Sequence, residues 1–273
     1  MTIAMIPVPN APRTLRASLI LLGTLLNAQE PGAPSPLAAL EELSGKACQP
    51  TQDTGVPPRA RATLERFKDG LGPWVLKRLA SLPDGSTAEL GQKLSQDLDA
   101  VAAQAVKPGD SFWHPLRFQV ETPAAHPELM AVTAHFGIDA TFLLLRRGEQ
   151  GWRLLWQDRA PALEDIDGAF GRYTALTTPG GADGAFFLAA ARITPWYQSN
   201  WQQAELRVFR IDANGAVHKV GGREEGVFLG VKEPMSLRVQ DARHIALRLR
   251  AASNDPVRHT FSRVFHFRLE PTG

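Results

Sequence analysis

The sequence predicts an α+β protein in which helices precede a mostly antiparallel β body. Two observations carry this prediction. Between Pro36 and Lys107, apolar residues recur at spacings of three and four, the period of an amphipathic helix. From Ser111 onward they alternate with polar residues, and turn residues interrupt the pattern about every ten positions, as in antiparallel strands. We expect a helical region over 37–109 and the β body over 110–273.

The N-terminus has the pattern of an export signal. Arg13 and Arg16 precede an apolar run from Ala17 to Leu26, and a cleavage position follows at Ala28. The run is shorter than the roughly 20 residues of a membrane span. A membrane-anchoring segment and an ordinary helix are the alternatives. We expect a signal peptide over 1–28, a linker over 29–36, and a mature protein in the periplasm or outside the cell.

Four helices are expected before the strands. The clearest opens with the capping box Ser86-Thr87-Ala88-Glu89, and its apolar residues recur at helical spacing until Lys107-Pro108-Gly109 stops the pattern. Such a stripe predicts packing against a neighbouring layer. The other three helices are expected from Pro36 to about Ala47, from Pro58 to Asp69-Gly70, and from Pro73 to a point before Pro83.

The β body is expected to contain short strands bounded by turn residues. They are Leu116 to Thr122, Leu129 to Gly137, Thr141 to Arg147, Trp152 to Asp158, Phe170 to Thr177, Ala185 to Thr194, Glu205 to Ile211, Val217 to Val220, Gly226 to Leu229, Ser236 to Gln240, His244 to Arg250 and Thr260 to Leu269.

A hairpin pattern recurs in this body. Phe142 to Leu155 and Leu206 to Lys219 each read as a strand, a polar turn ending in Gly, and a return strand, and Thr260 to Leu269 is similar to the first strand of a third copy. The repeat predicts sheets of about four antiparallel strands. Stacked or sandwiched sheets are favoured, and propeller-like blades are the alternative, because three blades are fewer than a propeller has.

The composition excludes some functional classes. The chain of 273 residues has 30 basic and 28 acidic side chains, whereas nucleic-acid-binding proteins concentrate basic charge strongly. The single cysteine, Cys48, cannot form an intramolecular disulfide, and we expect a buried, unreactive thiol. The sequence has no catalytic serine elbow, phosphate loop or histidine pair at metal-ligand spacing, and Gly180-Gly181 and Gly221-Gly222 are interpreted as turns. No catalytic residue is assigned.

Three segments stand out in the stretch from Thr133 to Phe267, namely Ile193 to Trp201, Arg207-Val208-Phe209-Arg210 and Gly226 to Val231. With these segments, this part of the β body resembles a group of exported bacterial proteins that have no assigned activity. The resemblance implies export and a β-rich body. It implies no catalytic residue.

Loop aromatics form the first candidate site. Aromatic rings beside amides can stack on a sugar ring or anchor a peptide. Alternatively, the rings fold back and cap the sheet, as large apolar rings at element ends often do. The residues are Trp196, Tyr197, Ser199, Asn200 and Trp201.

An acidic segment forms the second candidate site. Glu164, Asp165 and Asp167 stand before Gly168, and closely spaced carboxylates can bind a hard cation such as Ca²⁺. The remaining ligands of a calcium loop are missing, because Arg172 and Tyr173 follow. A solvated turn is therefore the alternative that we favour. No other cofactor is expected.

The last predicted strands provide the third candidate. Basic and apolar residues alternate there, which places a basic face opposite the core. Such a face can hold an anionic polysaccharide or another cell-surface polymer, or it can simply be solvated. The basic positions are Arg238, His244, Arg248 and Arg250, continued by His266 and Arg268.

From these patterns we expect an exported, non-enzymatic binding or structural protein. Its partner would be a glycan, a peptide or an anionic polymer, with no nucleic acid and no membrane span beyond the leader. The alternative is a hydrolase of cell-envelope or extracellular polymers, for which paired carboxylates in one cleft would be required.

Overall fold

The computed structural model describes most of the chain after the predicted leader. The described residues are 36–49, 56–105, 116–136, 139–159, 172–195, 201–228, 235–241, 244–252 and 260–268. They all belong to the unit Pro34–Gly273. The predicted signal peptide lies outside the described residues, and so does the predicted linker except for Pro36.

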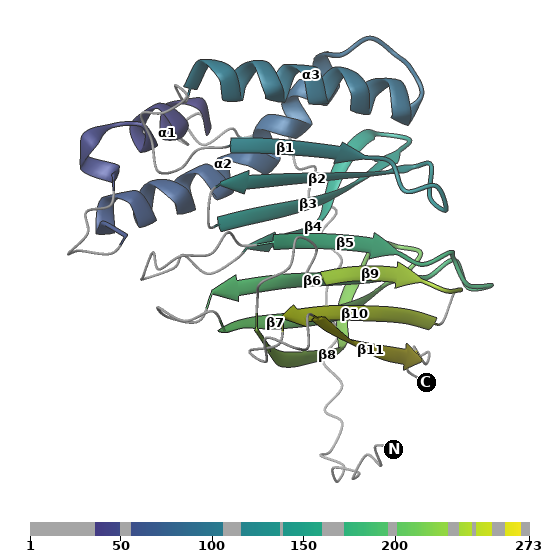
Figure 1. The fold of residues 1–273 in the computed structure, drawn as a ribbon. Helices are drawn as coiled ribbons and strands as arrows, with labels where there is room; N and C mark the ends of the chain where they lie inside the picture. The colour runs from purple at the N-terminus through teal and green to yellow at the C-terminus, as the bar shows by residue number, and fades with distance from the viewer. Residues whose placement is uncertain are drawn as a thin grey trace, which may run out of the picture. The chain divides into compact units, whose positions relative to one another are not determined.

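Within the described residues, three α-helices precede the strands (Figure 1). The predicted separation of two helices between Gly70 and Pro73 is wrong, because one helix continues through Pro73. Its apolar stripe stays buried from Leu64 to Leu79, and this burial outweighs the backbone hydrogen bond that a proline removes. None of these helices has the length and apolarity of a membrane span. The helices are α1 (Pro36–Leu43), α2 (Pro58–Ser81) and α3 (Thr87–Ala105), with a 3-10 helix at Lys46–Cys48.

The predicted capping box at the start of α3 is confirmed. The Ser86 backbone N–H donates to Glu89 Oε2 at 2.8 Å, and the Glu89 backbone N–H donates to Ser86 Oγ at 3.3 Å. The backbone hydrogen bond from Ser86 lowers the pKa of the Glu89 carboxyl. Two backbone N–H groups that the helix itself cannot satisfy therefore have acceptors.

Eleven strands follow in the described part of the chain, all of them antiparallel to their neighbours. The predicted strands that begin at Val217 and Gly226 belong to one strand, β8. This strand stays paired with β7 through Gly221 and Gly222. The strands are β1 (Leu116–Glu121), β2 (Leu129–Phe136), β3 (Asp139–Gly148), β4 (Gly151–Arg159), β5 (Arg172–Thr177), β6 (Phe186–Pro195), β7 (Trp201–Ile211), β8 (Val217–Phe228), β9 (Met235–Val239), β10 (His244–Ala252) and β11 (Thr260–Arg268).

The strands form three sheets in which chain neighbours are sheet neighbours. Sheet 1 has the order β1-β2-β3-β4, sheet 2 the order β5-β6-β7-β8, and sheet 3 the order β9-β10-β11. The α+β class and the predicted antiparallel body are therefore confirmed. Strand β11 takes the third place in its sheet, as β3 and β7 do in theirs, which agrees with the predicted hairpin repeat.

The two complete hairpins share an irregularity. The register shifts between Leu144 and Leu145 in the pair β3–β4, and between Val208 and Phe209 in the pair β7–β8. These positions coincide when Phe142 is aligned with Leu206. A bulge at the same place bends both hairpins alike, which favours a repeated sheet unit.

Three apolar cores hold the layers together. The helices pack on one face of sheet 1 through residues such as Phe67 and Leu143. The opposite face of sheet 1 packs on sheet 2, for example through Phe142 and Phe186. The other face of sheet 2 packs on sheet 3, where Leu206 belongs to the same core as the β10 strand. The described residues of Pro34–Gly273 therefore pack in the order helices, sheet 1, sheet 2 and sheet 3 (Figure 1).

Candidate functional site

The outward face of sheet 3 arises from the alternation of its strands. In β10, Ile245, Leu247 and Leu249 are buried against sheet 2, whereas Arg248 between them is exposed. A strand turns successive side chains to opposite faces, so residues two apart share a side. The basic residues of β10 thus occupy positions on the side away from sheet 2.

The cross-strand register gathers basic residues from all three strands on this side. Ala246 lies opposite Arg238 of β9 and opposite His266 of β11, and His244 lies opposite Arg268. The Arg238, Arg248, His266 and Arg268 side chains are exposed, and His244 is partly exposed. For Arg250 the structure describes the backbone, which pairs with Ser262 in the same register. We call Arg238, His244, Arg248, Arg250, His266 and Arg268 the basic face.

The described ionisable side chains of the basic face are all basic. Its other described side chains are small or apolar, namely Ser236, Ala246 and Val264, and none of the described side chains on this side is a carboxylate. Neighbouring strands lie about 4.8 Å apart, so Arg238 and Arg248, which are two register positions apart on adjacent strands, lie about one Debye length from each other at physiological salt. The face can therefore attract and hold anionic groups.

One acidic residue borders the basic face. Asp241, in the turn between β9 and β10, has its Oδ2 atom 2.8 Å from His244 Nδ1. By contrast, Arg238 and Arg248 have no ion-pair partner among the described residues. The charge that is left for an external anion is therefore concentrated on the arginines.

A second group of charges lies between sheets 1 and 2. Arg192 of β6 directs Nε and Nη2 at Glu205 Oε2 of β7, each at 2.5 Å. Arg207 of β7 pairs with Asp158 of β4, whose side chain is only 4% exposed. Arg207 Nε also lies 3.4 Å from Glu205 Oε1. This chain of pairs links the two sheets.

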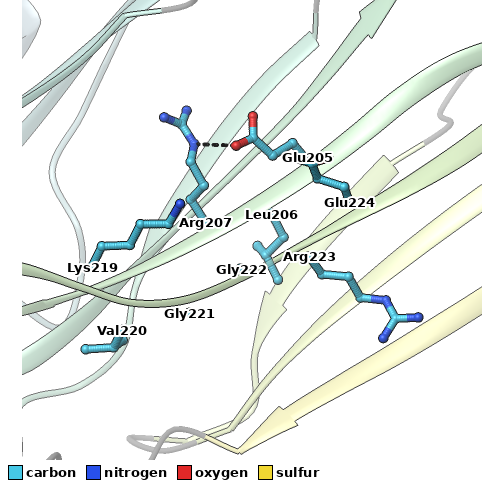
Figure 2. Close-up of a pocket in the computed structure, with 9 residues that line it drawn as sticks. All are labelled: Glu205, Leu206, Arg207, Lys219, Val220, Gly221, Gly222, Arg223 and Glu224. Atoms are coloured by element: carbon cyan, nitrogen blue, oxygen red, sulfur yellow. Dashed lines mark ion pairs between the residues drawn. The ribbon is translucent and has the colours of Figure 1, made fainter. Parts of the chain in front are cut away.

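A pocket adjoins this group on β7 and β8. It has a volume of about 480 Å³, in the usual range for small-molecule sites. Figure 2 shows Lys219, Arg207 and Glu205 close together, and Arg223 directed away from them. The lining residues are Glu205, Leu206, Arg207, Lys219, Val220, Gly221, Gly222, Arg223 and Glu224.

A third group of charges is buried beneath the helices. Lys68 Nζ of α2 lies 2.6 Å from Asp139 Oδ2 of β3, with side-chain exposures of 0% and 2%. Burial raises the pKa of Asp139 to about 6, although the Lys68 ammonium acts to lower it. The Gln157 side chain donates to the Lys68 carbonyl at 2.7 Å. These contacts fix α2 on sheet 1, so we assign them a structural role.

Most residues of the other two candidate sites lie outside the described part of the chain. This holds for Trp196, Tyr197, Ser199 and Asn200 and for Glu164, Asp165 and Asp167. Trp201 begins β7, and its backbone pairs with Phe228. Within the described residues, no group of three His, Cys, Asp or Glu side chains is placed to hold a metal ion. The aromatic-loop and calcium hypotheses remain predictions.

Sequence reasoning missed the β7–β8 pocket. The interpretation of Gly221-Gly222 as a turn is wrong, because both residues lie inside β8, opposite Val208 and Arg207. A glycine pair inside an otherwise alternating strand signals a bulge or a close backbone approach. That signal could have identified this position.

Comparisons with protein-family models, curated proteins and solved structures gave no match. The resemblance to exported bacterial proteins therefore stays a prediction. The functional argument rests on the geometry of the chain itself.

Proposed function

We propose that this protein is an exported, non-enzymatic binding protein that holds acidic polysaccharides on its basic face. The observation that carries the proposal is the exposure of Arg238 and Arg248 without a carboxylate partner among the described residues. Elsewhere, arginines such as Arg78 and Arg192 are paired with carboxylates. Two neighbouring exposed arginines on a sheet face, without a carboxylate partner among the described residues, are suited to an external anion.

The geometry of the face favours a polymer. The basic positions extend across three strands of one sheet, and a polymer with a charge on each unit can contact several of them together. Arginine adds directional contacts, because its planar guanidinium matches a carboxylate or sulfate with two parallel hydrogen bonds. The net charge of the chain is close to zero, whereas nucleic-acid-binding proteins are strongly basic, so we do not expect nucleic acid as the ligand.

Export would bring the protein to the compartment where cell-surface polysaccharides occur. This part of the proposal is supported by the basic and apolar pattern before Ala28. Mass spectrometry of the protein recovered from cells that carry the full chain tests it. We expect a mature N-terminus at Gln29 in an extracytoplasmic fraction, and an intact Met1 in the cytoplasm would contradict export.

The binding test uses polygalacturonate, which has a carboxylate on each sugar, and neutral dextran as the comparison. The double variant Arg238→Gln/Arg248→Gln removes two charges from the face. The matched control Arg117→Gln removes an exposed arginine from β1 of sheet 1. We expect the double variant to bind more weakly, with a dissociation constant raised at least tenfold, because a hydrogen bond to a charged group contributes about 1.5–3 kcal/mol.

Several outcomes would reject this function. Equal affinity of the wild type and the double variant for polygalacturonate would show that the basic face is not the binding site. Equal affinity of the wild type for dextran and for polygalacturonate would show that binding does not depend on charge. Shortening of the polymer during incubation with wild-type protein would instead support the hydrolase alternative, and size-exclusion chromatography of the polymer detects it.

A further inference from the structure

Strand β11 is an outer strand of sheet 3. It has nine residues and, among the described residues, pairs only with β10. Its register with β10 is uninterrupted from Thr260 to Arg268, and this range contains no proline. Bulges and prolines are two means by which an edge strand avoids pairing with another chain. Strand β11 has neither, so its outer backbone N–H and C=O groups can pair with a further strand.

An exposed apolar side chain lies at the centre of β11. Val264 is 40% exposed, and no other large apolar side chain among the described residues is as exposed. It is the register partner of Arg248, so it lies on the outward side of sheet 3. Removing apolar surface from water is favourable. A partner strand that places an apolar residue beside Val264 would therefore be preferred.

The sequence of β11 is complementary to a second copy of itself. When two copies pair antiparallel about Val264, this residue lies opposite its own counterpart. Each basic residue of one strand then lies opposite a neutral residue of the other, and like charges directly opposite each other, which would be destabilising, do not occur. The opposed pairs are Arg263 with Phe265, His266 with Ser262, and Arg268 with Thr260.

The basic faces of two such copies would repel each other only weakly. Because Arg248 is the register partner of Val264, the two Arg248 residues would be separated by three strand spacings, about 14 Å. The two His266 residues would be four residues apart along the strands, about 13 Å. Both separations exceed the Debye length of about 8 Å at physiological salt. Screening therefore reduces the repulsion.

From these observations we propose that β11 is the contact surface for a second copy of this chain, and that two copies pair antiparallel about Val264. The pairing has twofold symmetry, the commonest symmetry of homo-oligomers. Sheet 3 then continues across the contact in the order β9-β10-β11-β11-β10-β9. Opposed residues share a side of a sheet, so both basic faces lie on the same side. One strand pair buries little surface, and we expect a weak dimer that forms as concentration rises.

Sedimentation velocity of the protein without polymer, over a hundredfold range of concentration, tests the pairing. We expect the mean mass to rise from that of the monomer toward that of the dimer. Val264→Lys places two lysines opposite each other and should raise the dissociation constant of the dimer at least tenfold. Ser236→Lys adds the same charge on β9, on the same side of the sheet, and is the matched control. It should dimerise as the wild type does.

A disulfide tests the register of the pairing. The only cysteine of the chain, Cys48, is buried, so a cysteine introduced at an exposed position can be oxidised selectively. Directly opposed residues have Cβ atoms about 4.5–5.5 Å apart, close to the separation in a disulfide. We expect Val264→Cys to form a covalent dimer under mild oxidation. Ser236→Cys should remain largely monomeric.

Each outcome decides for or against the pairing. A wild type that stays monomeric over the whole range would overturn it, and so would a dimer that Val264→Lys leaves unchanged. Equal crosslinking of the two cysteine variants would overturn the register. Because Val264 is exposed, Val264→Lys should melt at the wild-type temperature, so a loss of dimer reports on the contact. Arg238→Gln/Arg248→Gln should dimerise as the wild type does, which distinguishes failure of this contact from failure of the polymer function.

Discussion

Lys68 and Arg248 carry the same charge in opposite surroundings. Lys68 is fully buried beneath the helices and pairs with Asp139, whereas Arg248 is exposed on the outward side of sheet 3 and has no ion-pair partner among the described residues. A buried charge must be paired because its desolvation is otherwise too costly. An exposed charge carries no such requirement. We therefore relate the buried pair to stability and the exposed arginines to binding.

The largest expected effect is the loss of one partner of the buried pair. Lys68→Met leaves the Asp139 carboxylate buried without its counter-charge, and we expect a loss of about 3–5 kcal/mol in the free energy of unfolding at neutral pH. Urea denaturation measures it. The apolar pair Lys68→Met/Asp139→Leu should recover most of that loss, because no charge remains to be desolvated. A Lys68→Met variant as stable as the wild type would contradict the structural role.

The pH dependence of the same pair is the second prediction. Burial raises the folded-state pKa of Asp139 to about 6, above its ordinary value of 3.8. The folded state therefore binds this proton more tightly, and the contribution of Asp139 to stability is fully present below pH 3.8 and is lost as the pH rises through 6. One pKa unit corresponds to about 1.4 kcal/mol, so the contribution should change by up to about 3 kcal/mol.

The measurement compares unfolding free energies of the wild type and Asp139→Asn between pH 4 and pH 7. The free energy of the wild type relative to that of the variant should increase on acidification, because only the wild type has a carboxyl group at this position. A difference that stays constant or decreases on acidification would show that the carboxyl group does not titrate as described.

An intermediate effect is expected between sheets 1 and 2. Asp158→Asn weakens the pair with Arg207, whose side chain is 15% exposed. Water reaches this guanidinium more easily than it reaches Lys68, so we expect a loss of about 1–3 kcal/mol. Thermal and urea unfolding measure it. A loss as large as that of Lys68→Met would contradict the proposed relation between burial and stability.

The fold was largely predictable from the sequence because its signals are local. Period-two alternation and turn residues located nearly all strands, and Ser86 with Glu89 marked the start of α3. Pro73 and Gly221 misled the prediction for a common reason. Each is a local breaker that long-range packing overrides, in one case through the buried stripe of α2 and in the other through pairing with β7.

The candidate sites were predictable only in part. The positions of the basic face follow from alternation within single strands, so Arg238 and Arg248 could be identified. The pocket requires the register between two strands, and the pair Lys68–Asp139 joins a helix to a strand that is distant in the sequence. Spacing within one segment contains no information about such contacts.

The smallest effect on stability is expected at the basic face. Arg238→Gln/Arg248→Gln should change the unfolding free energy by less than about 0.5 kcal/mol, since exposed charges without partners contribute little. Urea denaturation at low and high salt measures it. A loss above about 2 kcal/mol would assign these arginines to the fold, and the contrast with Lys68 would disappear.

The most direct test of the central claim is to locate the bound polymer on the protein. Phenylglyoxal modifies accessible arginines, and mass spectrometry after proteolysis gives the modification rate of each residue. With saturating polygalacturonate, we predict that the rates at Arg238 and Arg248 decrease several-fold while the rate at Arg117 on sheet 1 is unchanged. Equal protection of all three, or protection of Arg117 alone, would contradict binding at the basic face.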